Sequence, residues 1–291
     1  MNVDVTNIWI DFNYLTDIFI SVFLWYNYLR RVKKGEDMNL TIMLIILAVL
    51  PSVFIGTIIY KNDVVEKEPV KFLRKLFALG VALSAIVILL TGVLQSIVPF
   101  LAQDLKTLSG LELFISMFLS VALIEEGCKW LTFKLVAWNS KNFDYIYDAI
   151  VYSVFISLGF ATIENVLYVV NGGLWVALVR SICSVPGHAY FGITMGYYLG
   201  LAKQATINGN NDIRNKNLFL SIIIPTTLHT IFNFCLFTQS TTGLIFYLVF
   251  LVLLFVNSTK KIKQLSRITS SMWYNISRKK EIKWCMEWKI H

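Results

Sequence analysis

The sequence predicts an all-α protein, a polytopic integral membrane bundle of seven to eight transmembrane helices. Hydrophobic residues make up 56% of the 291 residues and charged residues only 15%, a composition too apolar for one soluble domain. The apolar residues gather in windows of about 20 residues, the length that a helix needs to cross the hydrocarbon core. These observations place the chain in the cell membrane as a multi-pass protein.

Seven windows are apolar and long enough to be confident spans. They are separated by short polar breaks, such as NGG at 171–173 and the loop KQATINGNNDIRNKN at 203–217. The windows cover residues 39–60, 72–98, 111–135, 146–170, 174–201, 217–238 and 242–257.

The N-terminal segment allows two interpretations. Residues 8–29 could form an eighth span, although Asp11 and Asp17 weaken it, or an interfacial helix anchored by Trp9 and Trp25. We therefore expect three parts. These are an N-terminal segment with a possible extra span at 1–38, the helical core at 39–258 and a basic cytoplasmic tail at 259–291.

Basic residues predict the orientation of the helices. Nine of the 26 Lys and Arg lie in the last 32 residues. We interpret this cluster as a cytoplasmic surface that contacts anionic lipid headgroups, and we expect no nucleic-acid partner despite the net charge of +8. Counting back from a cytoplasmic tail places the basic segments 61–75, 134–145 and 203–217 inside as well, in agreement with the positive-inside rule. The same count places RRVKK at 30–34 outside, which conflicts with that rule.

Charged residues lie inside one predicted span, in the stretch LIEEGCKWL at 123–131. An ionised side chain at the centre of a spanning helix costs on the order of 3 kcal/mol when lipid surrounds it. Glu125, Glu126 and Lys129 must therefore face protein or water. Lys129 is four residues from Glu125 and three from Glu126, so its ammonium can pair with either carboxylate on one helix face. A self-contained ion pair would leave the second carboxylate unpaired.

Further polar residues occur in three other predicted spans. Glu164 and Asn165 stand in an apolar stretch with no basic residue nearby in sequence. His188 and His229 also lie in spans, and Asn233 follows His229 by four residues, so these two side chains project from one helix face. Singly, such residues are usually hydrogen-bonding or packing residues. Together they predict a buried polar cluster that serves as a hydrolytic or ion-binding centre.

The segment around His188 favours close approach of helices. Pro186 precedes the histidine and should bend or restart the helix there. Glycines spaced four apart follow it, and such a stripe lets a neighbouring backbone approach closely. They are Gly192, Gly196 and Gly200.

These motifs resemble the PrsW family of intramembrane proteases, which is related to type II CAAX prenyl proteases and to bacteriocin-immunity membrane proteins. The similarity covers roughly residues 39–240, and Lys129 and Glu164 favour the PrsW branch. It rests on YKNDVVEKEP at 60–69, EEGCK at 125–129, FATIEN at 160–165, His188 with its following glycines, and HTIFN at 229–233.

The resemblance implies hydrolysis of a peptide bond within or next to the membrane. Glu125 or Glu126 would take a proton from water, and we favour Glu125 as the base with Glu126 as its support. Lys129 would offset their charge. Asn233 would hydrogen-bond the oxyanion.

The resemblance also implies a metal and a substrate. Glu164, His188 and His229 would bind a divalent metal, for which zinc suits neutral imidazole and carboxylate, or would position the water directly. The implied substrate is a single-pass membrane protein such as an anti-sigma factor, cut during stress signalling. Two alternatives stay open from the residues alone. They are an ion-coupled transporter and a non-catalytic immunity or scaffolding relative.

Overall fold

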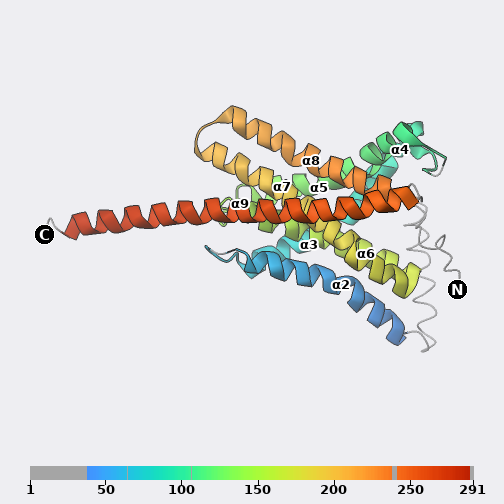
Figure 1. The fold of residues 1–291 in the computed structure, drawn as a ribbon, viewed down its shortest axis with the longest axis horizontal. Helices are drawn as coiled ribbons and strands as arrows, with labels where there is room; N and C mark the ends of the chain where they lie inside the picture. Colours follow the sequence, from blue (N-terminus) through green and yellow to red (C-terminus); the bar gives the residue numbers. More distant parts are fainter. Residues whose placement is uncertain (1–37, 64, 106, 238–240, 289–291) are drawn as a thin grey trace.

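The computed structural model describes residues 38–288 apart from 64, 106 and 238–240, and all regular structure in these residues is helical (Figure 1). The side chains of 38, 39, 171 and 272–288 lie outside this description, as do the possible span at 8–29 and the basic run at 30–34. The all-α prediction is confirmed. The α-helices are α2 (Met38–Lys61), α3 (Val70–Ile97), α4 (Gly110–Met117), α5 (Leu123–Thr132), α6 (Asp148–Ile182), α7 (Ser184–Ile207), α8 (Asn211–Phe237) and α9 (Thr241–Trp288).

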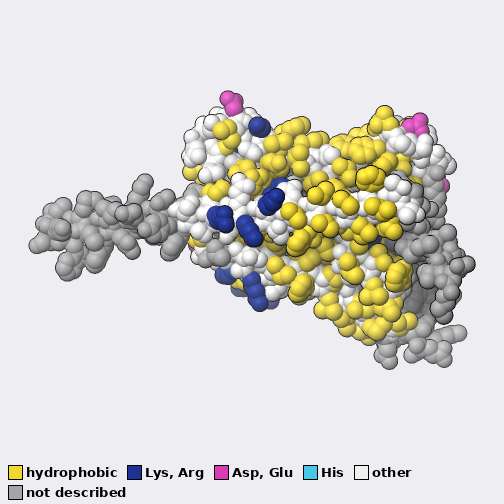
Figure 2. Space-filling model, in the orientation of Figure 1, with side chains coloured by type: hydrophobic (Ala, Val, Ile, Leu, Met, Phe, Trp, Pro, Cys, Tyr) yellow, Lys and Arg dark blue, Asp and Glu magenta, His cyan; other side chains and the backbone are white. Residues whose placement is uncertain are grey.

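Five helices in the described part of the chain have the length and hydropathy to cross a membrane. They match five of the seven predicted windows. Large apolar side chains cover the outward faces of α2, α3 and α9, and Figure 2 shows hydrophobic side chains over much of one face of the bundle. Such a surface suits lipid rather than water. The spans are Leu40–Lys61, Val70–Ile97, Asp148–Val170, Asn211–Phe237 and Thr241–Ser271.

The predicted count of seven to eight spans is not confirmed, because two windows do not form one long apolar helix. Window 111–135 is divided among α4, a π-helical segment at Phe118–Ala122, α5 and a second π-helical segment at Phe133–Ala137. Window 174–201 contains the end of α6 and most of α7, with a break at Cys183. Helix α7 is buried along most of its length. It contacts protein rather than lipid, so small and polar residues replace the uniformly apolar surface of a lipid-facing span.

Two breaks that the sequence predicts are present. Helix α6 is interrupted at Gly173, whose φ of 71° and ψ of −162° form a conformation that only glycine adopts readily. Helix α7 starts at Ser184, so Pro186 lies in its first turn, where the missing N–H of proline has no helical partner to lose. The second break sets the start of the helix that carries His188.

Glycines bring α7 and α6 into backbone contact. A Cβ atom on Gly196 would lie 2.4 Å from the carbonyl oxygen of Ala149, and one on Gly200 would lie 2.5 Å from that of Ile146. These distances are shorter than any real Cβ contact, so only glycine fits. The predicted close approach at the glycine stripe is confirmed, and it holds the two helices that supply His188 and Glu164 at a fixed distance.

Helix α9 extends beyond the rest of the bundle. It is continuous from Thr241 to Trp288, and Figure 1 shows its C-terminal part projecting away from the other helices. The border predicted between core and tail, at residues 258 and 259, falls inside this helix. Figure 2 shows Lys and Arg side chains gathered toward the end from which α9 projects. The molecule therefore has one markedly basic end.

Candidate active site

Helix α5 carries the paired glutamates and Lys129, between the two π-helical segments. All three side chains are at most 1% exposed. Lys129 Nζ lies 2.7 Å from Glu126 Oε1 and 3.6 Å from Glu125 Oε2. The predicted ion pairing on one helix face is confirmed, and a single ammonium serves both carboxylates. π-helical turns are rare and are found mostly at functional sites.

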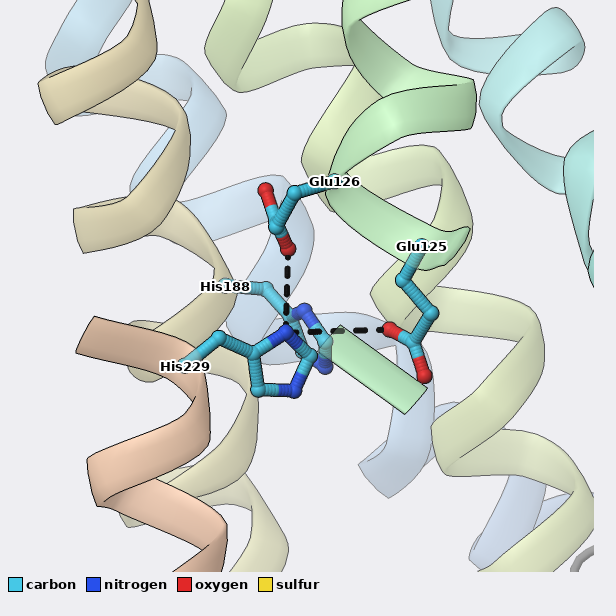
Figure 3. Close-up of side chains that lie close together, drawn as sticks. All are labelled: Glu125, Glu126, His188 and His229. Atoms are coloured by element: carbon cyan, nitrogen blue, oxygen red, sulfur yellow. Dashed lines mark hydrogen bonds and ion pairs between the residues drawn. The ribbon is translucent and has the colours of Figure 1, made fainter. Parts of the chain in front are cut away.

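Helix α8 brings His229 to the same point. Its Nδ1 lies 3.1 Å from Glu126 Oε1 and 4.0 Å from Glu125 Oε2 (Figure 3). The imidazole stacks on the ring of Phe191, with ring centroids 4.8 Å apart and planes 20° apart. The stacking fixes the orientation of His229 toward the glutamates.

Helix α7 contributes His188 from its second turn. His188 Nδ1 lies 3.2 Å from Lys129 Nζ, and its Nε2 lies 2.9 Å from Glu164 Oε2 on α6. An ammonium group only donates, so Nδ1 accepts and Nε2 carries the proton that Glu164 accepts. The two imidazole rings lie 5.2 Å apart between centroids. His188 therefore connects the glutamates of α5 with the carboxylate of α6.

Arg180 completes this side of the site, and the sequence analysis did not identify it. Its Nη2 lies 3.2 Å from Glu164 Oε1, and its Nε donates to Asn165 Oδ1 at 3.2 Å. Asn165 in turn donates to the carbonyl oxygen of Ala48 on α2 at 2.8 Å. The sequence does contain a sign of Arg180, since it places this cation within the apolar window 174–201. In the structure the side chain is buried. The pairing is hard to see in sequence, because the break at Gly173 separates Arg180 from its partners.

Four of the predicted residues form a group that fits a metal ion. One ligand atom from each of Glu125, Glu126, His188 and His229 lies within 4.8 Å of the others, and all four residues are buried. Carboxylate oxygen and imidazole nitrogen are the donors that zinc and similar divalent ions take. Glu126 Oε2 is also buried without a hydrogen-bond partner in the described structure. The ammonium of Lys129 is paired with donors of this group, at 2.7 Å from Glu126 Oε1 and 3.2 Å from His188 Nδ1.

The other predicted site residues lie beside this group. Glu164 contacts it through the Nε2 side of His188, the side turned away from Lys129. Asn233 is buried four residues beyond His229 on α8, but it is not one of the four residues that converge.

Comparison with known proteins identifies the family. Residues 68–257 match the family described as "PrsW family intramembrane metalloprotease". This range contains every predicted site residue, from Glu125 to Asn233. No solved structure matches the chain.

Curated relatives match over most of their length. Protease PrsW of Clostridioides difficile (strain 630) is 34% identical over 245 residues, which is 82% of this chain and 98% of the relative. Protease PrsW of Oceanobacillus iheyensis is 35% identical over 76% of this chain and 95% of the relative. Protease PrsW of Bacillus subtilis (strain 168) is 33% identical over 74% of this chain and 92% of the relative. With its membrane-spanning helices and its buried group of glutamates and histidines, the chain belongs to the PrsW family of intramembrane metalloproteases, and it is a multi-pass membrane hydrolase that acts on protein.

Proposed function

We propose that this protease hydrolyses a peptide bond of a membrane-protein substrate with a water molecule that a glutamate activates. The observation that carries the proposal is the convergence of two carboxylates and two imidazoles from α5, α7 and α8 at a buried point. Ionisable groups are costly inside a membrane bundle and mark functional sites there. Carboxylates for proton transfer and imidazoles for metal binding are the groups that a metalloprotease needs.

We assign His188 and His229 to a divalent metal, for which zinc is the best match to the donors. Glu164 is hydrogen-bonded to His188 Nε2, whereas His188 Nδ1 points to Lys129 and the glutamates of α5. The third donor in this proposal is therefore a carboxylate of α5 and not Glu164. When bound, such an ion lowers the pKa of its water and polarises the scissile carbonyl. Glu164, predicted from sequence as a ligand, would then orient the imidazole of His188 and hold its tautomer.

We assign the role of base to Glu125. It would accept a proton from the water as the water oxygen bonds to the carbonyl carbon, and would return that proton to the nitrogen as the C–N bond breaks. Contacts within the site support this choice. Glu126 Oε1 lies within 3.1 Å of both Lys129 and His229, whereas the nearest distances from Glu125 to the same two residues are 3.6 and 4.0 Å. Asn233 remains the proposed donor to the oxyanion.

The position of the site along the helices supports cleavage near one membrane face. Glu164 lies six residues before the end of the span Asp148–Val170, and His229 lies eight residues before the end of the span Asn211–Phe237. These separations correspond to about 9–12 Å of helix. Water and an extended substrate segment would reach the site from this end, which is opposite the basic end.

The substrate that we propose is a single-pass membrane protein of the anti-sigma-factor type, as the resemblance to the family implies. We also propose that the basic end of the molecule contacts anionic lipid headgroups. Basic side chains on α9 support this contact, since they lie where the helix leaves the bundle. They include Lys260, Lys263 and Arg267.

Cleavage of a fluorogenic transmembrane peptide by the purified chain in detergent tests the proposal. Glu125→Gln keeps the shape of the side chain but removes the base, so kcat/KM should fall by at least about 10²-fold. Glu112→Gln, on the exposed face of α4, is the matched control and should retain activity. Full activity in both Glu125→Gln and Glu126→Gln would exclude the glutamate mechanism.

A chelator distinguishes a metal-dependent mechanism from one in which the glutamate acts without a metal. If a metal takes part, activity should disappear on chelation and return when Zn²⁺ is added. Persistent activity under chelation, together with an inactive Glu125→Gln variant, would show that the glutamate acts without a metal.

A further inference from the structure

A second group of buried acidic residues lies at the ends of three spans. Asp63 follows α2, Glu68 precedes α3 and Asp148 is the first residue of α6. Each is at most 4% exposed, and one carboxylate oxygen of each lies within 4.8 Å of those of the other two. Asp148 precedes Glu164 by 16 positions on α6, a rise of about 24 Å. The group is therefore separate from the active site and lies toward the opposite end of the bundle.

No Lys or Arg in the described residues makes an ion pair with these three carboxylates. The two nearby lysines attract them but have other partners. Lys67 Nζ donates to the backbone carbonyl oxygens of Tyr60, Lys61 and Asp63. Lys203 Nζ donates to the carbonyl oxygen of Trp138 at 3.2 Å and lies over the ring of Phe143. Both lysines therefore lie near the group and attract it, but neither ammonium is paired with one of its carboxylate oxygens.

Several polar atoms in and beside the group lack a hydrogen-bond partner in the described structure. Asp63 Oδ2 and Asp148 Oδ1 are both buried and unpartnered. Tyr147, which is not part of the acidic group, is 1% exposed, and its hydroxyl is also unpartnered. Burial and the charge of Asp63 raise the pKa of Tyr147. Unsatisfied buried polar atoms are costly, and buried carboxylate oxygens without a partner are positions at which water or an ion binds.

Two other oxygens of the group, one on Glu68 and one on Asp148, are held in place by hydrogen bonds. The Glu68 and Tyr152 side chains are hydrogen-bonded to each other, and Tyr152 Oη also lies 2.7 Å from the carbonyl oxygen of Asn142. Asp148 Oδ2 accepts from the backbone N–H of Tyr145 at 2.8 Å. The carboxylates of Glu68 and Asp148 are therefore oriented before any ligand binds, which lowers the cost of binding.

Burial makes a net negative charge in this group costly. It raises the pKa of Asp63 to about 6 and that of Glu68 to about 7. A cation bound between the carboxylates would offset this cost.

We propose that Asp63, Glu68 and Asp148 bind a hard divalent cation of the Mg²⁺, Mn²⁺ or Ca²⁺ class. All three donors are carboxylate oxygens, with no imidazole or thiolate among them, and hard cations prefer such oxygen ligands. The donors come from the α2–α3 loop and from the start of α6. The cation ties these elements together at the basic end of the bundle, and it differs in ligand type from the ion proposed for the active site.

Binding of Mn²⁺ to the full chain in detergent, measured by the loss of the free-ion electron paramagnetic resonance signal, tests this site. Asp148→Asn retains an acceptor for the N–H of Tyr145 but removes one charged ligand, so the affinity should fall at least about tenfold. His229→Ala disrupts the active site and should still bind Mn²⁺ at the acidic group. Because His229→Ala is inactive under the proposed function, this result does not depend on proteolysis.

Asp144→Asn is the matched control, because it removes an exposed carboxylate close to the group and should change the affinity less than twofold.

Thermal unfolding is the second readout. Mn²⁺ or Ca²⁺ should raise the melting temperature of the unchanged chain by at least about 3 °C relative to chelator. Asp148→Asn should show no such rise. If Asp148→Asn does not fold, Asp63→Asn replaces it. Equal Mn²⁺ binding in the unchanged chain and the Asn variant, or no binding below millimolar concentrations, would overturn the proposal. The three carboxyl groups would then be neutralised by shared protons and not by a cation.

Discussion

Lys129 contacts three active-site groups at once. Its ammonium lies within 3.6 Å of Glu125, Glu126 and His188, and it lies over the ring of Phe160 at 4.4 Å from the centroid. A buried cation with this many partners holds together side chains from three helices, α5, α6 and α7. Removing it would leave two carboxylates without their shared counter-ion, which is the costly way to break a buried ion pair.

Lys129→Met should therefore destabilise the fold by about 3–5 kcal/mol. The measurement is thermal or denaturant unfolding in detergent. Lys134→Met, which changes a partly exposed lysine that lies over Trp138, should cost less than about 1 kcal/mol. Adding Glu126→Gln to Lys129→Met should restore part of the stability, because it removes one of the stranded charges. Additive losses in the double variant would contradict the role of Lys129 as a counter-ion.

For single residues, the sequence predicted which polar side chains belong to the site better than it predicted which of them pair with one another. The pairing of Glu125 and Glu126 with Lys129 follows from helical spacing alone. The pairing of Glu164 with Arg180 does not. Those two residues are 16 positions apart and lie on opposite sides of the break at Gly173, so their proximity depends on how the chain turns there.

At the scale of elements, the contact between α6 and α7 sets the distance between Glu164 and His188. A side chain on Gly196 would meet the backbone of Ala149 and Ile150 at 2.4–2.5 Å. Backbone atoms cannot rotate away as a side chain can, so the helices would have to separate. The site would widen with them.

Gly196→Ala should destabilise the protein by about 1–3 kcal/mol and reduce cleavage. Unfolding in detergent and peptide cleavage measure the two effects. Gly127→Ala is the matched control within a helix, because a Cβ there would meet nothing within 4 Å. It should leave stability unchanged or raise it by up to about 1 kcal/mol. Equal effects of the two substitutions would show that helix propensity, and not the contact with α6, decides the result.

Uniformly apolar helices could be predicted from the sequence, and a helix rich in small and polar residues could not. The five spans carry the long apolar stretches that hydropathy detects, including Asp148–Val170, which is mostly buried in the bundle. Helix α7 is surrounded by other helices, so it contains glycines, a threonine and a histidine where a lipid-facing span would carry large apolar residues. The π-helical segments on either side of α5 have no sequence signal of this kind, because each depends on one shifted hydrogen bond within a helix.

At the scale of the whole molecule, the two acidic groups lie toward opposite ends of the bundle. The Asp63, Glu68 and Asp148 group is at the basic end, near the loops that follow α2 and α7. The active site lies toward the other end, where the spans Asp148–Val170 and Asn211–Phe237 finish. Which end faces the cytoplasm therefore decides on which side of the membrane a substrate is cut.

Labelling of single cysteines in intact cells would determine this orientation. We expect the basic end to be cytoplasmic, because basic loops are retained inside. In a chain without its native cysteines, Gln103→Cys, an exposed position after α3, should react with a membrane-impermeant maleimide in intact cells. Asn210→Cys, an exposed position between α7 and α8, should react only after the membrane is permeabilised. Each position is the control for the other, since both lie in exposed loops.

The opposite labelling pattern would invert the orientation and place the active site in the cytoplasmic half of the membrane. Labelling of both positions in intact cells would mean that the helices between them do not cross as the positive-inside rule predicts.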